Sequence, residues 1–177
     1  MPASSSDGIV LTEYDPSWPA QFAAERTRIL AALGGLQADI EHIGSTAIPG
    51  LVAKPVIDIM IGRPTESELR PYIDALQRLG YEYRGQSGIP GRHYFRRGRP
   101  RTHHLHLVPY GGDLWRNHLR FRDHLRADPA LAAEYAALKR RLAAQFAEDR
   151  VAYTDAKAPF ITRVLRASTI DTEDRSF

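Results

Sequence analysis

The sequence predicts one α/β (α+β) domain, in which helices flank a mixed sheet and the C-terminal part is helical. Strand-length apolar runs, such as residues 54–61 and 105–108, alternate with segments whose apolar residues recur every three or four positions. The length of 177 residues suits one main core. The predicted order is helix, two strands, helix, three strands and then helices.

The first half of the chain holds the first predicted strands. Residues 9–11 form a short apolar run, expected as an edge strand or a packed arm. A helix is expected to follow residues 15–17 and to end at Gly34-Gly35. Residues 38–43 are a predicted strand that runs into a Gly-Ser-Thr turn. Residues 54–61 are almost wholly apolar, which favours a strand covered on both faces.

Capping residues predict where the later helices begin. Thr65 with Glu68 forms a capping box, which predicts a helix to about residue 80. Asp128-Pro129 predicts the start of another helix, and Thr154 is expected to cap the last one. The intervening strands are predicted at residues 81–83, 94–96 and 105–108, with a loop at 85–92.

The domain is expected to span residues 9–169, with a flexible N-terminus at 1–8 and a C-terminal tail at 170–177. The chain has no cysteine, which excludes disulfides, thiolate metal sites and cysteine nucleophiles. We find no secretion signal and no apolar run of the roughly 20 residues that a membrane span needs. A cytoplasmic protein without membrane contact is therefore expected.

The Gly44-Ser45-Thr46 turn is the first candidate site. Glycine lets a ligand approach the backbone closely, and the serine hydroxyl adds a hydrogen-bond donor. Such a turn suits a phosphate group, although an ordinary strand-to-loop turn is the commoner meaning of a Gly-Ser pair.

Asp58 lies in the middle of the apolar run at residues 54–61. An unpaired carboxylate in a buried strand is costly, so this acid is expected to be paired, hydrogen-bonded or bound to a metal. A structural role, in which Asp58 caps a neighbouring turn, is the alternative.

Two histidines are predicted to share one face of a strand. The alternation places His104 and His106 together and His103 on the opposite face. Two imidazoles on one face can hold a divalent ion or contact a phosphate. An ordinary polar surface is the alternative.

The cations of the chain are concentrated locally. The formal net charge is only +3, but residues 92–101 are rich in arginine, and Lys54 precedes Asp58. Lys54 and Arg101 are the cations expected to bind phosphate. A nucleic-acid module that binds through residues 92–101 is the third and least favoured reading of this pattern.

Together these segments resemble the GrpB family, also known as UPF0157, over roughly residues 9–165. The resemblance rests on Tyr14-Asp15-Pro16-x-Trp18, His42-Ile43-Gly44-Ser45-Thr46-x-x-Pro49-Gly50-Leu51, Lys54-Pro55-x-Ile57-Asp58-Ile59, His104-Leu105-His106, Phe121-Arg122-Asp123-x-Leu125-Arg126, Tyr135-x-x-Leu138-Lys139 and Lys157-x-x-Phe160-Ile161.

That family is similar to the nucleotidyltransferase superfamily, so the resemblance implies a nucleotidyltransferase-like fold. It implies that Gly44 and Ser45 hold nucleotide phosphates and that Asp58 is the first catalytic acid. The superfamily's second acid would lie at position 60, which is Met60 here. A centre with two Mg²⁺ ions is therefore not expected. One divalent ion (Mg, Mn or Zn) on Asp58, His104 and His106, or no ion, fits the sequence better.

Two functions follow from the resemblance. The first is an enzyme that transfers a nucleotidyl or phosphoryl group to a small acceptor, with Asp58 and Ser45 as catalytic residues. The second is a non-catalytic module that binds a nucleotide or CoA and assists another protein. A related domain is fused to dephospho-CoA kinase in some bacteria and is regarded there as a folding accessory, which implies a protein partner connected with CoA biosynthesis.

Overall fold

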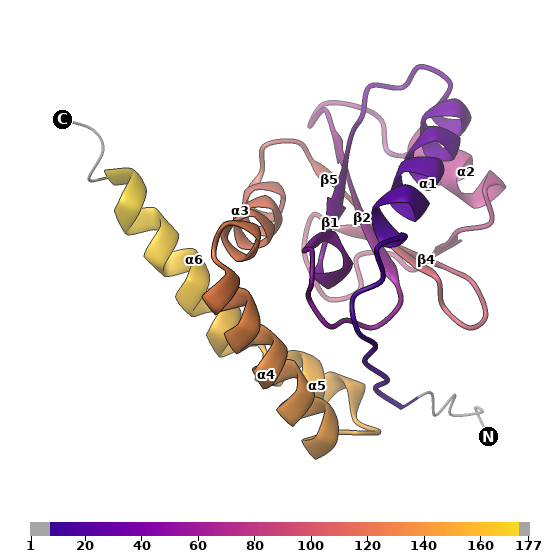
Figure 1. The fold of residues 1–177 in the computed structure, drawn as a ribbon. Coiled ribbons are helices and arrows are strands. Elements are labelled where there is room, and N and C mark those ends of the chain that lie inside the picture. Colours follow the sequence, from indigo (N-terminus) through magenta and orange to yellow (C-terminus); the bar gives the residue numbers. More distant parts are fainter. Residues whose placement is uncertain (1–7, 174–177) are drawn as a thin grey trace.

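The computed structural model describes residues 8–173, and the side chains of residues 8–167. The strands are β1 (Asp39–Ile43), β2 (Ile57–Arg63), β3 (Glu82–Tyr83), β4 (His93–Arg97) and β5 (His103–Pro109). The helices are α1 (Trp18–Leu33), α2 (Arg70–Arg78), α3 (Asp113–Ala127), α4 (Pro129–Gln145), α5 (Arg150–Ala156) and α6 (Ala158–Glu173), with a 3-10 turn, η1, at Ser45–Ala47. This order confirms the predicted mixed sheet, flanking helices and helical C-terminal part (Figure 1).

The five strands form one mixed sheet in the order β1-β2-β5-β4-β3. Strands β2 and β5 run parallel, and the other neighbouring pairs are antiparallel. In the parallel ladder, Asp58 lies beside His104 and Met60 lies beside His106. Because successive side chains of a strand alternate between faces, all four of these side chains lie on the same face of the sheet.

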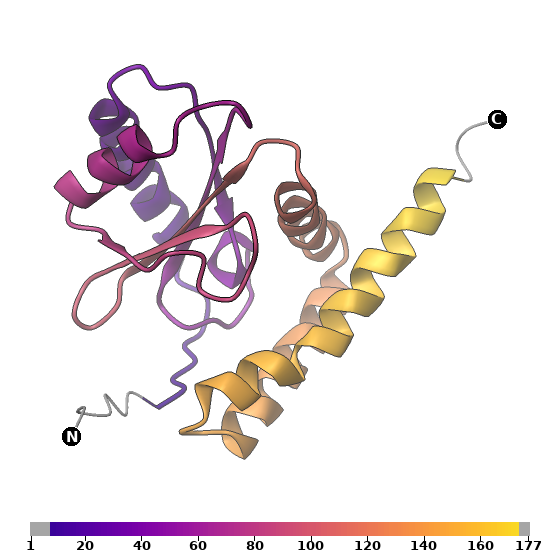
Figure 2. The ribbon, with the colours of Figure 1, turned by 180° about the vertical axis from the view of Figure 1, so that it is seen from behind.

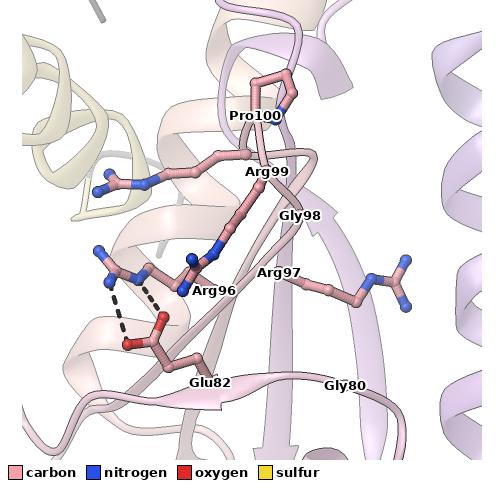
Figure 3. Close-up of a pocket in the computed structure, with 8 residues that line it drawn as sticks. Gly80, Glu82, Arg96, Arg97, Gly98, Arg99 and Pro100 are labelled. Atoms are coloured by element: carbon pink, nitrogen blue, oxygen red, sulfur yellow. Dashed lines mark hydrogen bonds and ion pairs between the residues drawn. The ribbon is translucent and has the colours of Figure 1, made fainter. Parts of the chain in front are cut away.

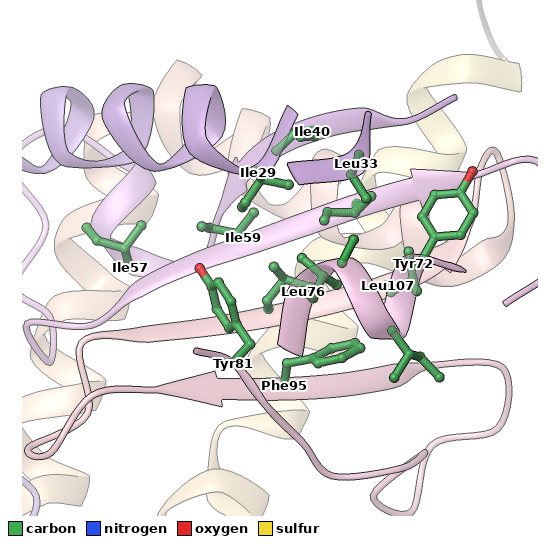
Figure 4. Close-up of a cluster of buried hydrophobic side chains, with 14 of the residues drawn as sticks. Ile29, Leu33, Ile40, Ile57, Ile59, Tyr72, Leu76, Tyr81, Phe95 and Leu107 are labelled. Atoms are coloured by element: carbon green, nitrogen blue, oxygen red, sulfur yellow. The ribbon is translucent and has the colours of Figure 1, made fainter. Parts of the chain in front are cut away.

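The opposite face of the sheet carries the main core. Helices α1 and α2 cover it, as Figure 4 shows. Ile57, Ile59 and Ile61 of β2 pack there with Leu76 of α2 and Ile29 of α1, and each of these five side chains is at most 1% exposed. These contacts account for the predicted burial of β2 on one of its two faces.

Helix α3 lies on the other face of the sheet, where Met60 packs with Ile43, Val108 and Trp115. Helices α4 and α6 extend beyond the sheet (Figure 2). They join α3 and the segment after η1 in a separate apolar cluster, which includes Leu125 and Phe160. The C-terminal helices therefore join the rest of the protein through α3 and the segment after η1, on the face of the sheet that carries Asp58 and His104.

Two predicted caps are wrong. Helix α2 begins at Arg70, and Thr65 caps nothing, because residues 64–67 form a turn closed by the Ser67 hydroxyl donating to the Pro64 carbonyl. Thr154 lies inside α5, whose cap is Asp149; the last helix starts only at Ala158. In contrast, Asp128 does cap α4 as predicted, accepting from two backbone N–H groups.

Element bounds also differ from the predictions. Strand β2 starts at Ile57 rather than residue 54, since residues 54–56 form a turn at Pro55, and it continues to Arg63. Helix α6 runs to Glu173, past the boundary predicted at residue 169, whereas residues 1–7 and 174–177 lie outside the described part. No helix among the described residues is both long and apolar enough to cross a membrane.

The segment before α1 is a packed arm rather than a strand of the sheet. Thr12 forms an isolated antiparallel bridge with Ala53, and the Ile9 N–H donates to the Ala147 carbonyl at 2.8 Å. The arm thus contacts both the segment before β2 and the turn after α4.

Candidate functional site

The predicted site residues Asp58 and His104 touch across the parallel ladder. The Nδ1 atom of His104 lies 3.1 Å from the Asp58 Oδ1 atom. The side chains are 27% and 25% exposed, so both are partly open to solvent. An ionised Asp58 only accepts hydrogen bonds, which places the His104 proton on Nδ1 and leaves Nε2 as an acceptor.

These two side chains line a cavity of about 390 Å³. Gly44, Ser45 and Thr46 contribute one part of its wall, and the strands and the helices α3, α4 and α5 contribute the rest. Its charged, aromatic and histidine lining residues are Lys54, Asp58, Arg92, Tyr94, His104, His106, His118, Lys139, Tyr153 and Lys157. The cavity therefore combines four cationic side chains with a single carboxylate.

The Gly44 turn comes very close to Asp58. Gly44 has a φ of +70° and a ψ of −171°, a conformation that is essentially restricted to glycine. A Cβ atom at this position would lie 2.5 Å from the Asp58 Oδ2 atom. Glycine is therefore required here both for the backbone conformation and for the position of the carboxylate.

Asp58 remains ionised although it is enclosed. Burial raises the pKa of a carboxyl group, but the hydrogen bond from His104 and the positive charge of Lys157 act against it, and the pKa of Asp58 lies below its usual value. In a cavity with four cations, the ionised Asp58 carboxylate accepts hydrogen bonds and does not act as a proton donor.

His106 extends the histidine face of β5 toward α3. Its ring lies 5.7 Å from that of His118, centre to centre. Burial, together with the nearby His118, lowers the pKa of His106 to about 3, so this imidazole is neutral at neutral pH. The Nδ1 atom of His106 and the Nε2 atom of His104 are buried and have no hydrogen-bond partner among the described residues.

Lys139 reaches into the site from α4. This lysine is only 2% exposed, and its Nζ atom donates to the Ser45 hydroxyl at 2.8 Å and to the Val52 carbonyl. Burial and the charge of Lys157 lower the pKa of Lys139 to about 7. The Ser45 turn and the C-terminal helices are thus joined at the cavity by a buried cation.

Lys54 and Lys157 flank the same aromatic ring. Their Nζ atoms lie 4.8 and 4.5 Å from the centre of the Tyr153 ring, and neither forms an ion pair within residues 8–167. Burial and the neighbouring Lys157 lower the pKa of Lys54 to about 8. Mutually repelling cations without a carboxylate partner favour an anionic ligand.

The structure brings most of the predicted site residues together. Gly44, Ser45, Thr46, Lys54, Asp58, His104 and His106 all line the cavity. Among these residues, Thr46 is buried, and its hydroxyl already forms a 2.9 Å hydrogen bond with His42 Nε2. Arg101 lies instead on a second cavity, at the turn between β4 and β5. His103 faces away from Asp58, as predicted, and contacts Arg97.

Sequence reasoning included Arg92 only in the arginine-rich run at residues 92–101, and it did not name Lys139, Lys157 or His118 as site residues. A signal for Lys139 was present, because it follows Tyr135 by four positions and precedes Leu142 by three, on the apolar stripe of α4. A lysine on such a stripe either extends to solvent or enters a polar site. No comparable pattern marks Lys157 or His118.

The residues do not fit a two-metal centre. Met60, at the position of the second acid, is fully buried among apolar side chains and is absent from the cavity lining described here. Residues 8–167 contain no group of three or more His, Cys, Asp or Glu side chains arranged to hold a metal ion. This arrangement lends no support to a single ion on Asp58, His104 and His106, which stays a prediction from the sequence.

A family model described as GrpB protein matches residues 8–167, which is nearly all of the described part. The chain belongs to the GrpB family. It is 39% identical to the UPF0157 protein YqkA of Bacillus subtilis, over 84% of this chain but only 43% of that protein. It is 33% identical to the glutamate-rich protein GrpB of Alkalihalophilus pseudofirmus, over 89% of this chain and 94% of that one.

The solved structure of GrpB from Enterococcus faecalis has the same fold. Its TM-score to this GrpB-family chain is 0.83, with 34% identity over 92% of this chain and 99% of the other. A dephospho-CoA kinase of Mycolicibacterium paratuberculosis is 29% identical over 88% of this chain and 45% of its own length. A likeness to the Cid1 poly(U) polymerase, with a TM-score of 0.49 and 14% identity, is too weak to support a conclusion.

Anion binding in this cavity is expected to weaken as pH rises through about 7 to 8, the pKa values of Lys139 and Lys54. An anion favours protonated lysine, so the affinity is highest below these pKa values. Above them it declines by up to about tenfold per pH unit for each proton lost. Sulfate is the suitable probe, because its charge is constant over this range. Calorimetric titration with sulfate at several pH values measures the effect, and an affinity that stays level or rises would contradict it.

Proposed function

We propose that the cavity binds the phosphate groups of a nucleotide or another phosphorylated small molecule, and that it supports nucleotidyl or phosphoryl transfer to a small acceptor. The observation that carries this proposal is the lining of Lys54, Arg92, Lys139 and Lys157 around one carboxylate, next to the Gly44-Ser45 turn. Such cations neutralise phosphate oxygens and the charge that develops on them during transfer.

Each side chain then has a defined role. Lys139 and Ser45 hold the phosphate, while Lys54 and Lys157 balance its charge. The acceptor hydroxyl gives its proton to Nε2 of His104, a buried atom that a movement of the ring must first expose, as the hydroxyl oxygen attacks phosphorus. The leaving phosphate carries away the electrons of the broken P–O bond. Asp58 accepts the Nδ1 hydrogen bond throughout and stabilises the imidazolium that forms. No step depends on a metal ion.

The test is to replace Asp58 with asparagine, which keeps the shape of the side chain but removes its charge. With a nucleoside triphosphate and a mixture of small acceptors, release of phosphate or pyrophosphate is expected to fall about 100-fold or more. Asp39→Asn, at the exposed start of β1, is the matched control and is expected to leave turnover unchanged. Equal turnover in Asp58→Asn and the parent protein would remove Asp58 from the mechanism.

A second candidate is a module that binds a nucleotide or CoA without catalysis and assists a protein partner in CoA biosynthesis. The specific observation that favours it is Met60, packed among apolar residues where a catalytic acid would be needed. Similarity to part of a dephospho-CoA kinase supports the same candidate. Stable binding of a nucleotide or CoA, with no product from any nucleoside triphosphate, would favour this function over transfer.

A further inference from the structure

The turn between β4 and β5 forms a second basic cavity, of about 800 Å³ (Figure 3). Its lining includes Arg96, Arg97, Arg99 and Arg101. Among its described lining residues, Glu82 is the only carboxylate. The excess of guanidinium groups makes this cavity a candidate for a second anion.

The carboxylates near this turn already form ion pairs with arginines other than Arg99 and Arg101. Glu82 accepts hydrogen bonds from Arg96 at 2.7 and 3.1 Å and from Arg84 at 2.7 Å. Arg97 points away from this side, toward the buried Glu25, with contacts of 2.6 and 2.9 Å (Figure 3). Arg99 and Arg101, in contrast, make no ion pair within residues 8–167.

The backbone holds these two arginines in a tightly closed turn. Gly98 has a φ of +94°, and a Cβ atom there would lie 2.6 Å from the Thr102 hydroxyl oxygen. The Thr102 N–H donates to the Arg97 carbonyl at 2.9 Å, which closes the turn. The backbone at positions 99 and 101 is therefore preorganised, so binding an anion has to order only the arginine side chains.

The second basic cavity reaches the face of the sheet that carries the central cavity. Arg96 is the register partner of His104, so it lies on the face of the sheet that carries Asp58. Burial and the charges of Lys157 and Arg150 are the main causes of the lowered pKa of Lys54, and the charge of Arg101 also contributes. Cationic groups thus continue from the central cavity to the turn.

We propose that Arg99 and Arg101 bind a second anionic group of the ligand whose phosphate lies in the central cavity, so that the protein selects ligands with two or more phosphate groups. This inference rests on the proposed phosphate site. It adds a specificity that the central cavity alone does not have, because paired guanidinium groups bind phosphate oxygens through directed N–H donors.

The test compares inorganic phosphate with a linear polyphosphate long enough to reach both cavities, by calorimetric titration. The double variant Arg99→Gln/Arg101→Gln is expected to weaken polyphosphate binding about tenfold or more and to change phosphate binding less than about twofold. Arg120→Gln/Arg141→Gln, on exposed positions of α3 and α4, removes the same charge and is expected to leave both affinities unchanged.

Each outcome decides a different point. Equal weakening of both ligands by Arg99→Gln/Arg101→Gln, or no weakening, would overturn the second subsite while leaving the central phosphate site intact. Equal weakening of polyphosphate by the two double variants would show only general charge attraction and would also overturn it. Failure of inorganic phosphate to bind the unmodified protein would instead contradict the proposed function itself.

Discussion

Replacing Lys139 with methionine is expected to weaken the binding of inorganic phosphate by about 10- to 100-fold, because a hydrogen bond to a charged group contributes roughly 1.5–3 kcal/mol. Lys139 is the most deeply buried of the four cations that line the cavity. Its Nζ atom lies 2.8 Å from the Ser45 hydroxyl, so the two groups converge on the same part of the wall. Calorimetric titration with phosphate measures the loss.

Methionine suits this position, because Lys139 lies on the apolar stripe of α4 between Tyr135 and Leu142. The unpaired Val52 carbonyl costs free energy, but the removal of a buried charge offsets it, so little change in melting temperature is expected. Arg141→Met, on the exposed side of the same helix, is the matched control. Undiminished phosphate affinity in a folded Lys139→Met protein would exclude Lys139 from the site.

Replacing Gly44 with alanine is expected to abolish activity and to lower the free energy of unfolding by about 1–3 kcal/mol. The new Cβ atom would lie 2.5 Å from Asp58 Oδ2, well inside the normal contact distance, so the carboxylate or the turn must move. Either movement breaks the alignment of Asp58 with His104. Denaturant unfolding and the turnover assay measure the two effects.

The variant Gly50→Ala is a control that introduces backbone strain at a positive φ without a contact to Asp58. Gly50 has a φ of +78°, similar to that of Gly44, but a Cβ atom there would have no neighbour within 4 Å. This variant is therefore expected to lose some stability while keeping activity. If Gly44→Ala and Gly50→Ala behave alike in both measurements, the close approach of Gly44 to Asp58 has no functional meaning.

Much of the fold was predictable because apolar periodicity follows directly from burial. The alternation around His104 predicted that His104 and His106 share one face and that His103 lies on the other, and the structure confirms that placement. Helix caps were less predictable: Thr65 and Asp128 are both favourable N-cap residues, yet only Asp128 caps a helix. The segment after Thr65 is held in a turn by Arg63, whose guanidinium donates to the Thr65 and Ser67 carbonyls, contacts that local sequence does not reveal.

The part of the candidate site that lies on the sheet was predictable, whereas the part that comes from the C-terminal helices was not. Residues of the sheet, such as Asp58 and His104, come together through strand pairing, which sequence patterns describe well. Lys139 and Lys157 arrive from helices that pack on the sheet through a separate apolar cluster, and the orientation of that packing is a tertiary property. Arg101, expected to join the phosphate-binding residues, lines the second cavity because it lies in the turn after Arg97.

The central claim is that a phosphate group binds between the Ser45 turn and the lysines of the helices. A crystal structure with tungstate, a strongly scattering phosphate analogue, tests it most directly. We expect an anomalous peak within hydrogen-bonding distance of both the Ser45 hydroxyl and Lys139 Nζ. A fully occupied tungstate elsewhere on the surface, with this cavity empty, would contradict the claim.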